Sequence, residues 1–66
     1  MTTLEQNFLK LIIVNPGIEA ASLPRRGRGY TLKVLALDGL IHYGPGGWFA
    51  TRTGELAAMA LNGGAK

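Results

Sequence analysis

The 66-residue chain contains no cysteine and a single histidine. Disulfide bridges and thiolate metal sites are therefore excluded, and His42 cannot build a zinc centre without oxygen ligands. The longest apolar run near the amino terminus, residues 11–14, is too short for a signal peptide or a membrane span. We therefore expect one small, soluble, cytoplasmic domain with no metal or other cofactor, which is stabilised by packing alone.

Side chains suited to catalysis are also scarce. No motif joins the candidates, which fall in different predicted elements: Ser22, Asp38, His42 and Glu55. Gly27-x-Gly29 lacks the third glycine of a dinucleotide loop, and the glycine-rich residues 44–47 are followed by Trp48 instead of Lys-Ser or Lys-Thr. We predict that the protein is not an enzyme.

Positive charge is concentrated in one segment. The net charge is +3, and residues 25–33 hold three arginines, one lysine and no acid, while acids outnumber bases by one in the rest of the chain. Such a local cluster suits a polyanion such as nucleic acid. The alternative is a solvated basic loop that keeps the protein soluble.

Two short helices are expected before the basic segment. Thr2 or Thr3, each with Glu or Gln three residues later, predicts a capping box at the start of the first helix. Residues 15–17, Asn-Pro-Gly, end this helix, and residues 18–23 predict one or two further turns before Pro24. The apolar residues expected on the core face of the first helix are Leu4, Phe8, Leu11 and Ile12, with Leu9 and Ile13 beside them.

A third helix is predicted from Gly29 or Tyr30 to Asp38. Leucines three residues apart place one face inward, and Gly39 follows where a left-handed C-cap is needed. The residues expected inside are Leu32, Leu35 and Ala36, and those expected on the opposite face are Tyr30, Lys33 and Leu37.

Residues 40–43 and 48–51 flank Gly44-Pro45-Gly46-Gly47, which predicts a β-hairpin. Trp48 and Phe49 are neighbours on one strand and must point to opposite faces. We expect one ring in the core and the other against Tyr43 or the last helix, or else free as a stacking surface. His42 is interpreted as a surface or cross-strand packing residue.

The last predicted helix is capped by Thr53 and ends at Gly63-Gly64. Its stretch 56–61 is apolar on all sides, which is more than a monomer of this size buries easily. We expect Leu56, Met59 and Ala60 to seal the core against Phe8 and Ile12. The opposite side then predicts a homodimer interface formed by Ala57, Ala58 and Leu61.

Two spaced patterns carry a family resemblance: Leu32-x-x-Leu35-x-x-x-Gly39-Leu40-Ile41 and Thr51-x-x-Gly54. Together with the helices upstream, they resemble the winged helix-turn-helix domains of small bacterial, archaeal and phage regulators. The resemblance implies an α+β domain over residues 1–62, with three helices, a β-hairpin wing and a closing carboxyl-terminal helix. Residues 63–66 are expected to form a flexible tail.

The resemblance further implies a transcriptional regulator that occupies a site on double-stranded DNA. Arginines of the turn contact the phosphate backbone, the third helix reads bases, and the wing rests on the adjacent backbone. The DNA-binding residues expected on this basis are Arg25, Arg26, Arg28, Tyr30, Thr31, Lys33, Gly46, Gly47 and Arg52. Because Val34 and Leu37 make the outer face of the helix apolar, a protein-interaction module or an RNA-binding domain is the alternative.

Overall fold

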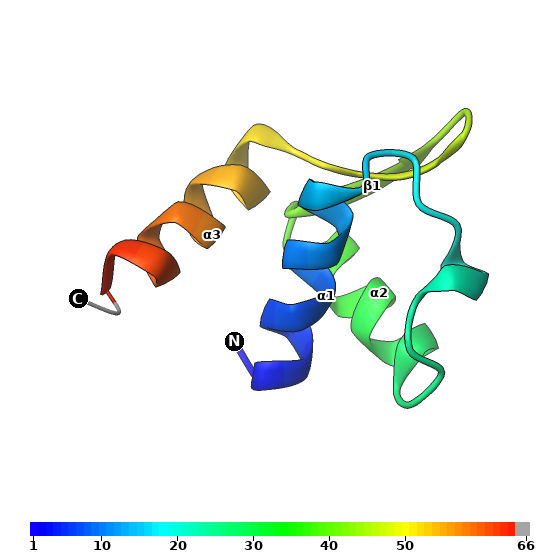
Figure 1. Cartoon of the computed structure of the whole chain (residues 1–66), viewed down its shortest axis with the longest axis horizontal. Helices are drawn as coiled ribbons and strands as arrows, with labels where there is room; N and C mark the ends of the chain where they lie inside the picture. The colour runs from blue at the N-terminus through cyan, green and yellow to red at the C-terminus, as the bar shows by residue number, and fades with distance from the viewer. Residues whose placement is uncertain (65–66) are drawn as a thin grey trace.

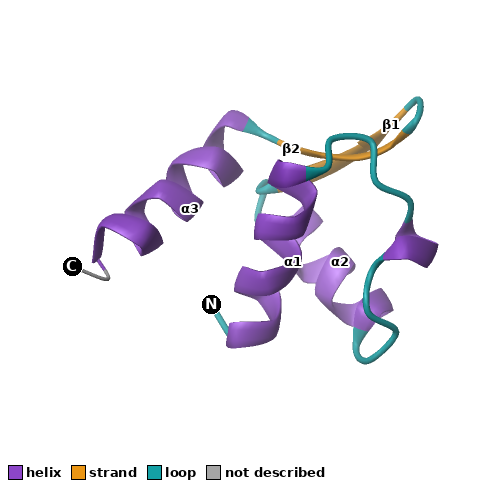
Figure 2. Cartoon of the chain, in the orientation of Figure 1, coloured by secondary structure: helices purple, strands orange, loops and turns teal. Residues whose placement is uncertain are grey.

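The computed structural model describes residues 1–64, which form an α+β arrangement of helices around one two-stranded antiparallel sheet (Figure 1). This class agrees with the prediction from the sequence. Figure 2 shows α1 in the middle, with α2 partly behind it and the hairpin above it. Helix α3 extends on the side of α1 that is opposite to α2. The elements are α1 (Thr3–Val14), the 3-10 helix η1 (Ala20–Ser22), α2 (Arg28–Leu37), β1 (Ile41–Gly44), β2 (Gly47–Ala50) and α3 (Arg52–Gly64).

Helix α1 begins at the predicted capping box. The Glu5 N–H donates to Thr2 Oγ1 at 3.2 Å, and the Thr2 N–H donates to Glu5 Oε1 at 3.4 Å. Leu11, which was expected on the core face, is exposed beside Pro24. The buried residues of this helix are Phe8, Leu9 and Ile12, so the core-facing stripe is narrower than the prediction.

The segment after α1 differs from the prediction. Only Ala20–Ser22 forms a helical turn, and Ile18 instead makes an isolated antiparallel bridge to Trp48. The Trp48 N–H donates to the Ile18 carbonyl at 2.9 Å, and the Gly17 N–H donates to the Trp48 carbonyl at 2.9 Å. Gly17 turns the chain into this bridge with a φ of 84°, which glycine adopts without strain. Through this bridge, the edge of β2 that faces away from β1 is also hydrogen-bonded.

Helix α2 starts earlier than predicted, because Gly27 caps it in the left-handed conformation with a φ of 64°. Leu32 and Leu35 are buried, as expected. The third inward position is Thr31, whereas Ala36, predicted to face the core, is exposed.

The hairpin forms where predicted, but both strands differ by one residue from the predicted ranges, and Gly44 and Gly47 pair with each other. The turn is therefore the two residues Pro45-Gly46 instead of the four residues 44–47. His42 pairs with Phe49 and stacks on its ring, with centroids 5.6 Å apart, which confirms that this histidine is a cross-strand packing residue. On the other face Trp48 packs against the core and meets Tyr43 edge-on, with centroids 5.1 Å apart. The two adjacent aromatic rings therefore do point to opposite faces of the hairpin.

Thr51, rather than the predicted Thr53, caps α3. Its Oγ1 accepts from the Gly54 N–H at 3.0 Å and donates to the Gly39 carbonyl at 2.6 Å. Gly54 is buried against the main chain of Leu40, where a Cβ atom would overlap the Leu40 carbonyl oxygen. The Thr51-x-x-Gly54 pattern thus joins α3 to the end of α2 and the base of the hairpin.

The orientation predicted for α3 is wrong. Ala58 is 6% exposed in the core and Ala57 packs against it, while Leu56 is 50% and Met59 65% exposed. With Leu61 half-buried, the residues named as the homodimer interface lie mainly on the interior side of the helix, so no dimer can use that side while this core is intact. The physical reason is the close approach at Gly54, which turns the small residues of this helix inward.

Helix α3 continues through Gly64 and so includes residues 63 and 64, the first two of the expected tail. Residues 65 and 66 lie outside the described part of the chain.

Gly54→Ala should destabilise the fold by roughly 1–3 kcal/mol, because the added methyl group collides with the main chain of Leu40, which cannot rotate away. Gly29→Ala is the matched control, since Gly29 lies in α2 with no atom within 4 Å of an added Cβ. Alanine there should stabilise the protein by about 0.5–1 kcal/mol. Urea denaturation followed by circular dichroism measures both values, and a neutral Gly54→Ala would contradict the close packing of α3.

The corrected orientation of α3 makes a second prediction. Ala58→Glu should lower the free energy of unfolding by about 3 kcal/mol or more, because it buries a carboxylate without a partner. Met59→Glu changes the neighbouring, exposed position by the same charge and should stay within about 0.5 kcal/mol of the parent. Thermal melts of the two variants decide the matter, and equal losses would mean that the helix faces are assigned incorrectly.

Candidate nucleic-acid interface

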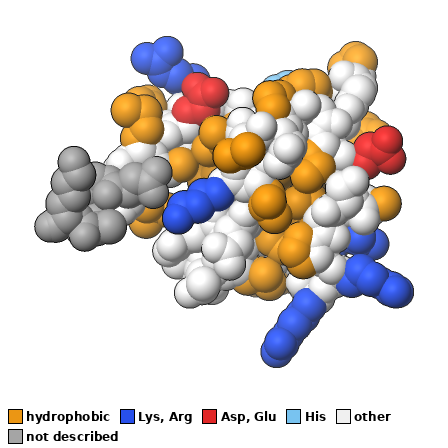
Figure 3. Space-filling model, viewed as in Figure 1, with side chains coloured by type: hydrophobic (Ala, Val, Ile, Leu, Met, Phe, Trp, Pro, Cys, Tyr) orange, Lys and Arg blue, Asp and Glu red, His pale blue; other side chains and the backbone are white. Residues whose placement is uncertain are grey.

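The loop between η1 and α2 carries two of the predicted phosphate contacts. Arg25 and Arg26 are both exposed, and the main chain around them turns tightly, with the Arg28 N–H donating to the Arg25 carbonyl at 3.3 Å. Figure 3 shows basic side chains gathered at the corner of the molecule where this loop lies. Forked guanidinium groups on an exposed turn are well suited to phosphate oxygens.

Arg28 has a different role from the one predicted. Its Nη1 donates to the carbonyl oxygens of Ala20 at 3.0 Å and Leu23 at 3.3 Å, and the side chain is half-buried. This guanidinium is engaged with main-chain carbonyls inside the molecule. Arg28 is therefore left out of the contact surface that the structure offers to a ligand.

The outer face of α2 adjoins the basic loop. Tyr30 and Leu37 are 73% and 77% exposed, and Lys33 is exposed between them. Positions 30, 33 and 37 share one side of an α-helix, as the sequence predicted. Thr31 is only 2% exposed and faces the core, so its side chain cannot reach bases, and it also leaves the candidate surface.

The hairpin contributes only its tip. Gly46 is exposed there with a φ of 92°, which fits a turn that places glycine after proline. Gly47 is buried, and a Cβ atom at this position would overlap the carbonyl groups of Gly17 and Ile18. Gly47 therefore holds the hairpin against the Gly17–Ile18 segment and offers no surface to a ligand.

Arg52 does not join the basic loop. It is exposed at the first position of α3, and Figure 1 shows the start of this helix far from the loop between η1 and α2. The exposed residues that the structure brings together are thus Arg25, Arg26, Tyr30, Lys33 and Leu37.

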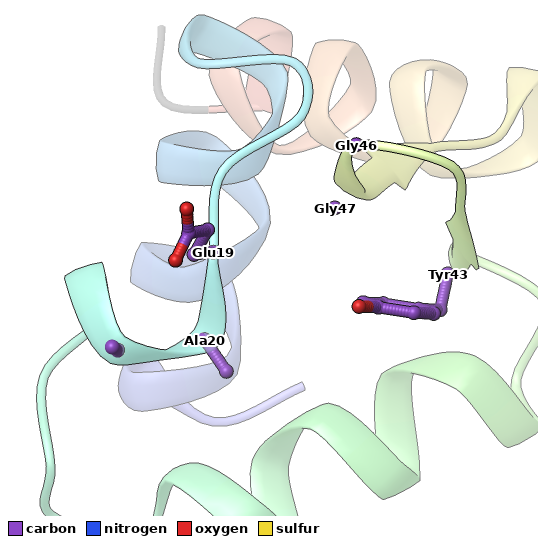
Figure 4. Close-up of a pocket in the computed structure, with 6 residues that line it drawn as sticks. Glu19, Ala20, Tyr43, Gly46 and Gly47 are labelled. Atoms are coloured by element: carbon purple, nitrogen blue, oxygen red, sulfur yellow. The ribbon is translucent and has the colours of Figure 1, made fainter.

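A hollow of about 430 Å³ lies between η1 and the hairpin (Figure 4). Tyr43 projects from β1 into this hollow, and Glu19 lies across from it. The remaining lining residues are Ala20, Ala21, Gly46 and Gly47, which supply no nucleophile or second acid. Within residues 1–64, no group of three or more His, Asp or Glu side chains is arranged to hold a metal ion.

Comparison of the chain with protein-family models, with curated proteins and with solved structures found no match. Across the described helices, none combines the length and the apolar character needed to cross a membrane.

Proposed function

We propose that the protein binds double-stranded DNA as a small winged helix-turn-helix transcriptional regulator. The observation that carries this proposal is the grouping of three exposed cations, Arg25, Arg26 and Lys33, on one turn and the helix face beside it. A cluster of this kind supplies the electrostatic part of DNA binding, which is largely independent of sequence.

The order of the elements supports the same proposal. Helix α2 is followed directly by the hairpin and then by α3, a layout compatible with a winged helix. A ten-residue helix is about 15 Å long and fits along the major groove, which is about 12 Å wide. The hairpin tip at Gly46 is uncharged, so it would approach the DNA backbone through main-chain N–H groups.

The mechanism is occupancy of a site, with no chemical step. Arg25 and Arg26 bind phosphates and set the orientation of the domain. Lys33 then offers its ammonium group to acceptors on base edges, guanine above all, and Tyr30 offers a hydroxyl and a ring. Leu37 has no polar atom in its side chain, so its contribution to the groove is an apolar contact.

A second candidate function is supported by that same apolar character. Tyr30 and Leu37 are the kind of large, exposed side chains that anchor protein partners. A protein-docking module would bind through these two residues with little dependence on salt. DNA binding, in contrast, weakens steeply as salt rises.

The Arg25→Ala, Arg26→Ala double variant should weaken binding to every duplex sequence. The slope of log affinity against log salt concentration should fall in magnitude by about 0.9 for each phosphate that the variant no longer neutralises. The matched control is Lys10→Ala, Arg52→Ala, which also removes two exposed positive charges but leaves the turn intact. Fluorescence titrations at several salt concentrations measure both variants. If the control loses as much slope as the first variant, the turn is not the interface, and if the parent binds no duplex at low salt, the proposed function fails.

Lys33→Ala should reduce preference for sequence rather than general affinity. On a duplex selected by the parent protein from a random pool, the loss should be roughly 1–3 kcal/mol, because a direct contact to a base edge disappears. On random duplexes the loss should be smaller. Competition titrations of selected against random DNA give the ratio, and equal losses on both would assign Lys33 to the phosphate backbone.

A further inference from the structure

Arg28 lies at the first position of α2, and its side chain reaches back to the 3-10 helix. The Nη1 donors bind the carbonyls of Ala20 and Leu23, at the beginning and at the C-cap of η1. The carbonyl at the C-cap of a short helix lacks a partner within that helix, so a guanidinium is well suited to satisfy the Leu23 carbonyl. The Ala20 carbonyl accepts from the Leu23 N–H at 3.0 Å as well as from Arg28. Leu23 is itself 3% exposed in the core, which anchors the far end of this link.

The link closes a small loop around the two exposed arginines. Residues 24–27 lie between the Leu23 carbonyl and Arg28, and Arg25 and Arg26 are both inside this loop. Gly27 and Gly29 flank Arg28, and glycine gives the main chain more freedom than any other residue. The Arg28 side chain therefore adds two restraints to a segment that is otherwise held by the hydrogen bond from the Arg28 N–H to the Arg25 carbonyl.

We propose that Arg28 is a positioning residue for DNA binding, which fixes the main chain so that Arg25 and Arg26 present their guanidinium groups in one arrangement. This inference rests on the proposed function. A segment ordered before binding loses less conformational entropy when it binds, and that gain does not depend on salt. A phosphate contact, by comparison, contributes both affinity and salt dependence.

The test compares two variants that remove the same charge from the same segment. Arg28→Met keeps most of the side-chain length and loses the donors to Ala20 and Leu23. Arg25→Met removes an exposed guanidinium and leaves those two hydrogen bonds in place. Circular dichroism first establishes that both variants are folded at the temperature of the assay.

The first readout needs no DNA. Trypsin cuts after Arg26 in the parent and in both variants, and mass spectrometry follows this cut. We expect Arg28→Met to be cut after Arg26 roughly tenfold faster than the parent, in line with the loss of two hydrogen bonds of ordinary net strength. Arg25→Met should be cut there at close to the parent rate.

The second readout is duplex binding across a salt series. Arg28→Met should lose affinity roughly three- to tenfold while the salt slope changes by less than about 0.3, whereas Arg25→Met should lose about 0.9 of slope. An equal loss of slope in both variants would make Arg28 a phosphate ligand and overturn the inference. Unchanged affinity of Arg28→Met, or cleavage after Arg26 at the parent rate, would overturn it as well. If no form of the protein binds a duplex, the proposed function has failed, and the cleavage rates still report whether Arg28 restrains the turn.

Discussion

The hydroxyl group of Thr51 is the point at which the three main parts of the structure meet. It donates to the carbonyl of Gly39, at the end of α2, and accepts from the N–H of Gly54, in the first turn of α3. The Thr51 N–H donates to the carbonyl of Leu40 at 2.9 Å, at the base of the hairpin. Thr51 therefore fixes the angles between α2, the hairpin and α3. Gly54, which has no Cβ atom, allows α3 to approach the main chain of Leu40 as closely as these hydrogen bonds require.

Features set by neighbours in the sequence could be predicted. The capping box at Thr2, the glycine at position 39 after α2, and the hairpin around Pro45-Gly46 all follow from local chemistry, and each is present in the structure. The bridge between Ile18 and Trp48 could not be predicted in this way. Its partners are distant in the sequence, and no local pattern distinguishes such a bridge from a turn of helix.

The face that α3 turns to the core shows another limit. Both sides of this helix are apolar, so hydrophobicity alone gives no preference between Leu56 with Met59 and Ala57 with Ala58. The smaller side chains, Ala57 and Ala58, face the core because α3 starts in direct contact with the main chain of Leu40, which leaves little space between the helix and the core. The sequence did contain a signal for this, since Gly54 is one turn before Ala58 on the same face.

Only the part of the candidate interface that depends on local helical spacing could be predicted. The outward positions of α2, Tyr30 and Lys33, follow from helical spacing, and they are exposed. The role of Arg28 depends on carbonyl groups of a segment whose conformation was not predicted. Thr31 faces inward because it lies four residues before Leu35, on the same side of α2.

The bridge between Ile18 and Trp48 has a consequence for the order of folding. The two strands of the hairpin pair residues that are close together in the chain, whereas this bridge closes a loop that contains η1, α2 and β1. Closing a longer loop restricts more of the chain before any contact compensates for it, which slows that step. Docking of the Gly17–Ile18 segment should therefore follow formation of the hairpin. Trp48, the single tryptophan of the chain, lies in this bridge, so its fluorescence should report when the Gly17–Ile18 segment docks.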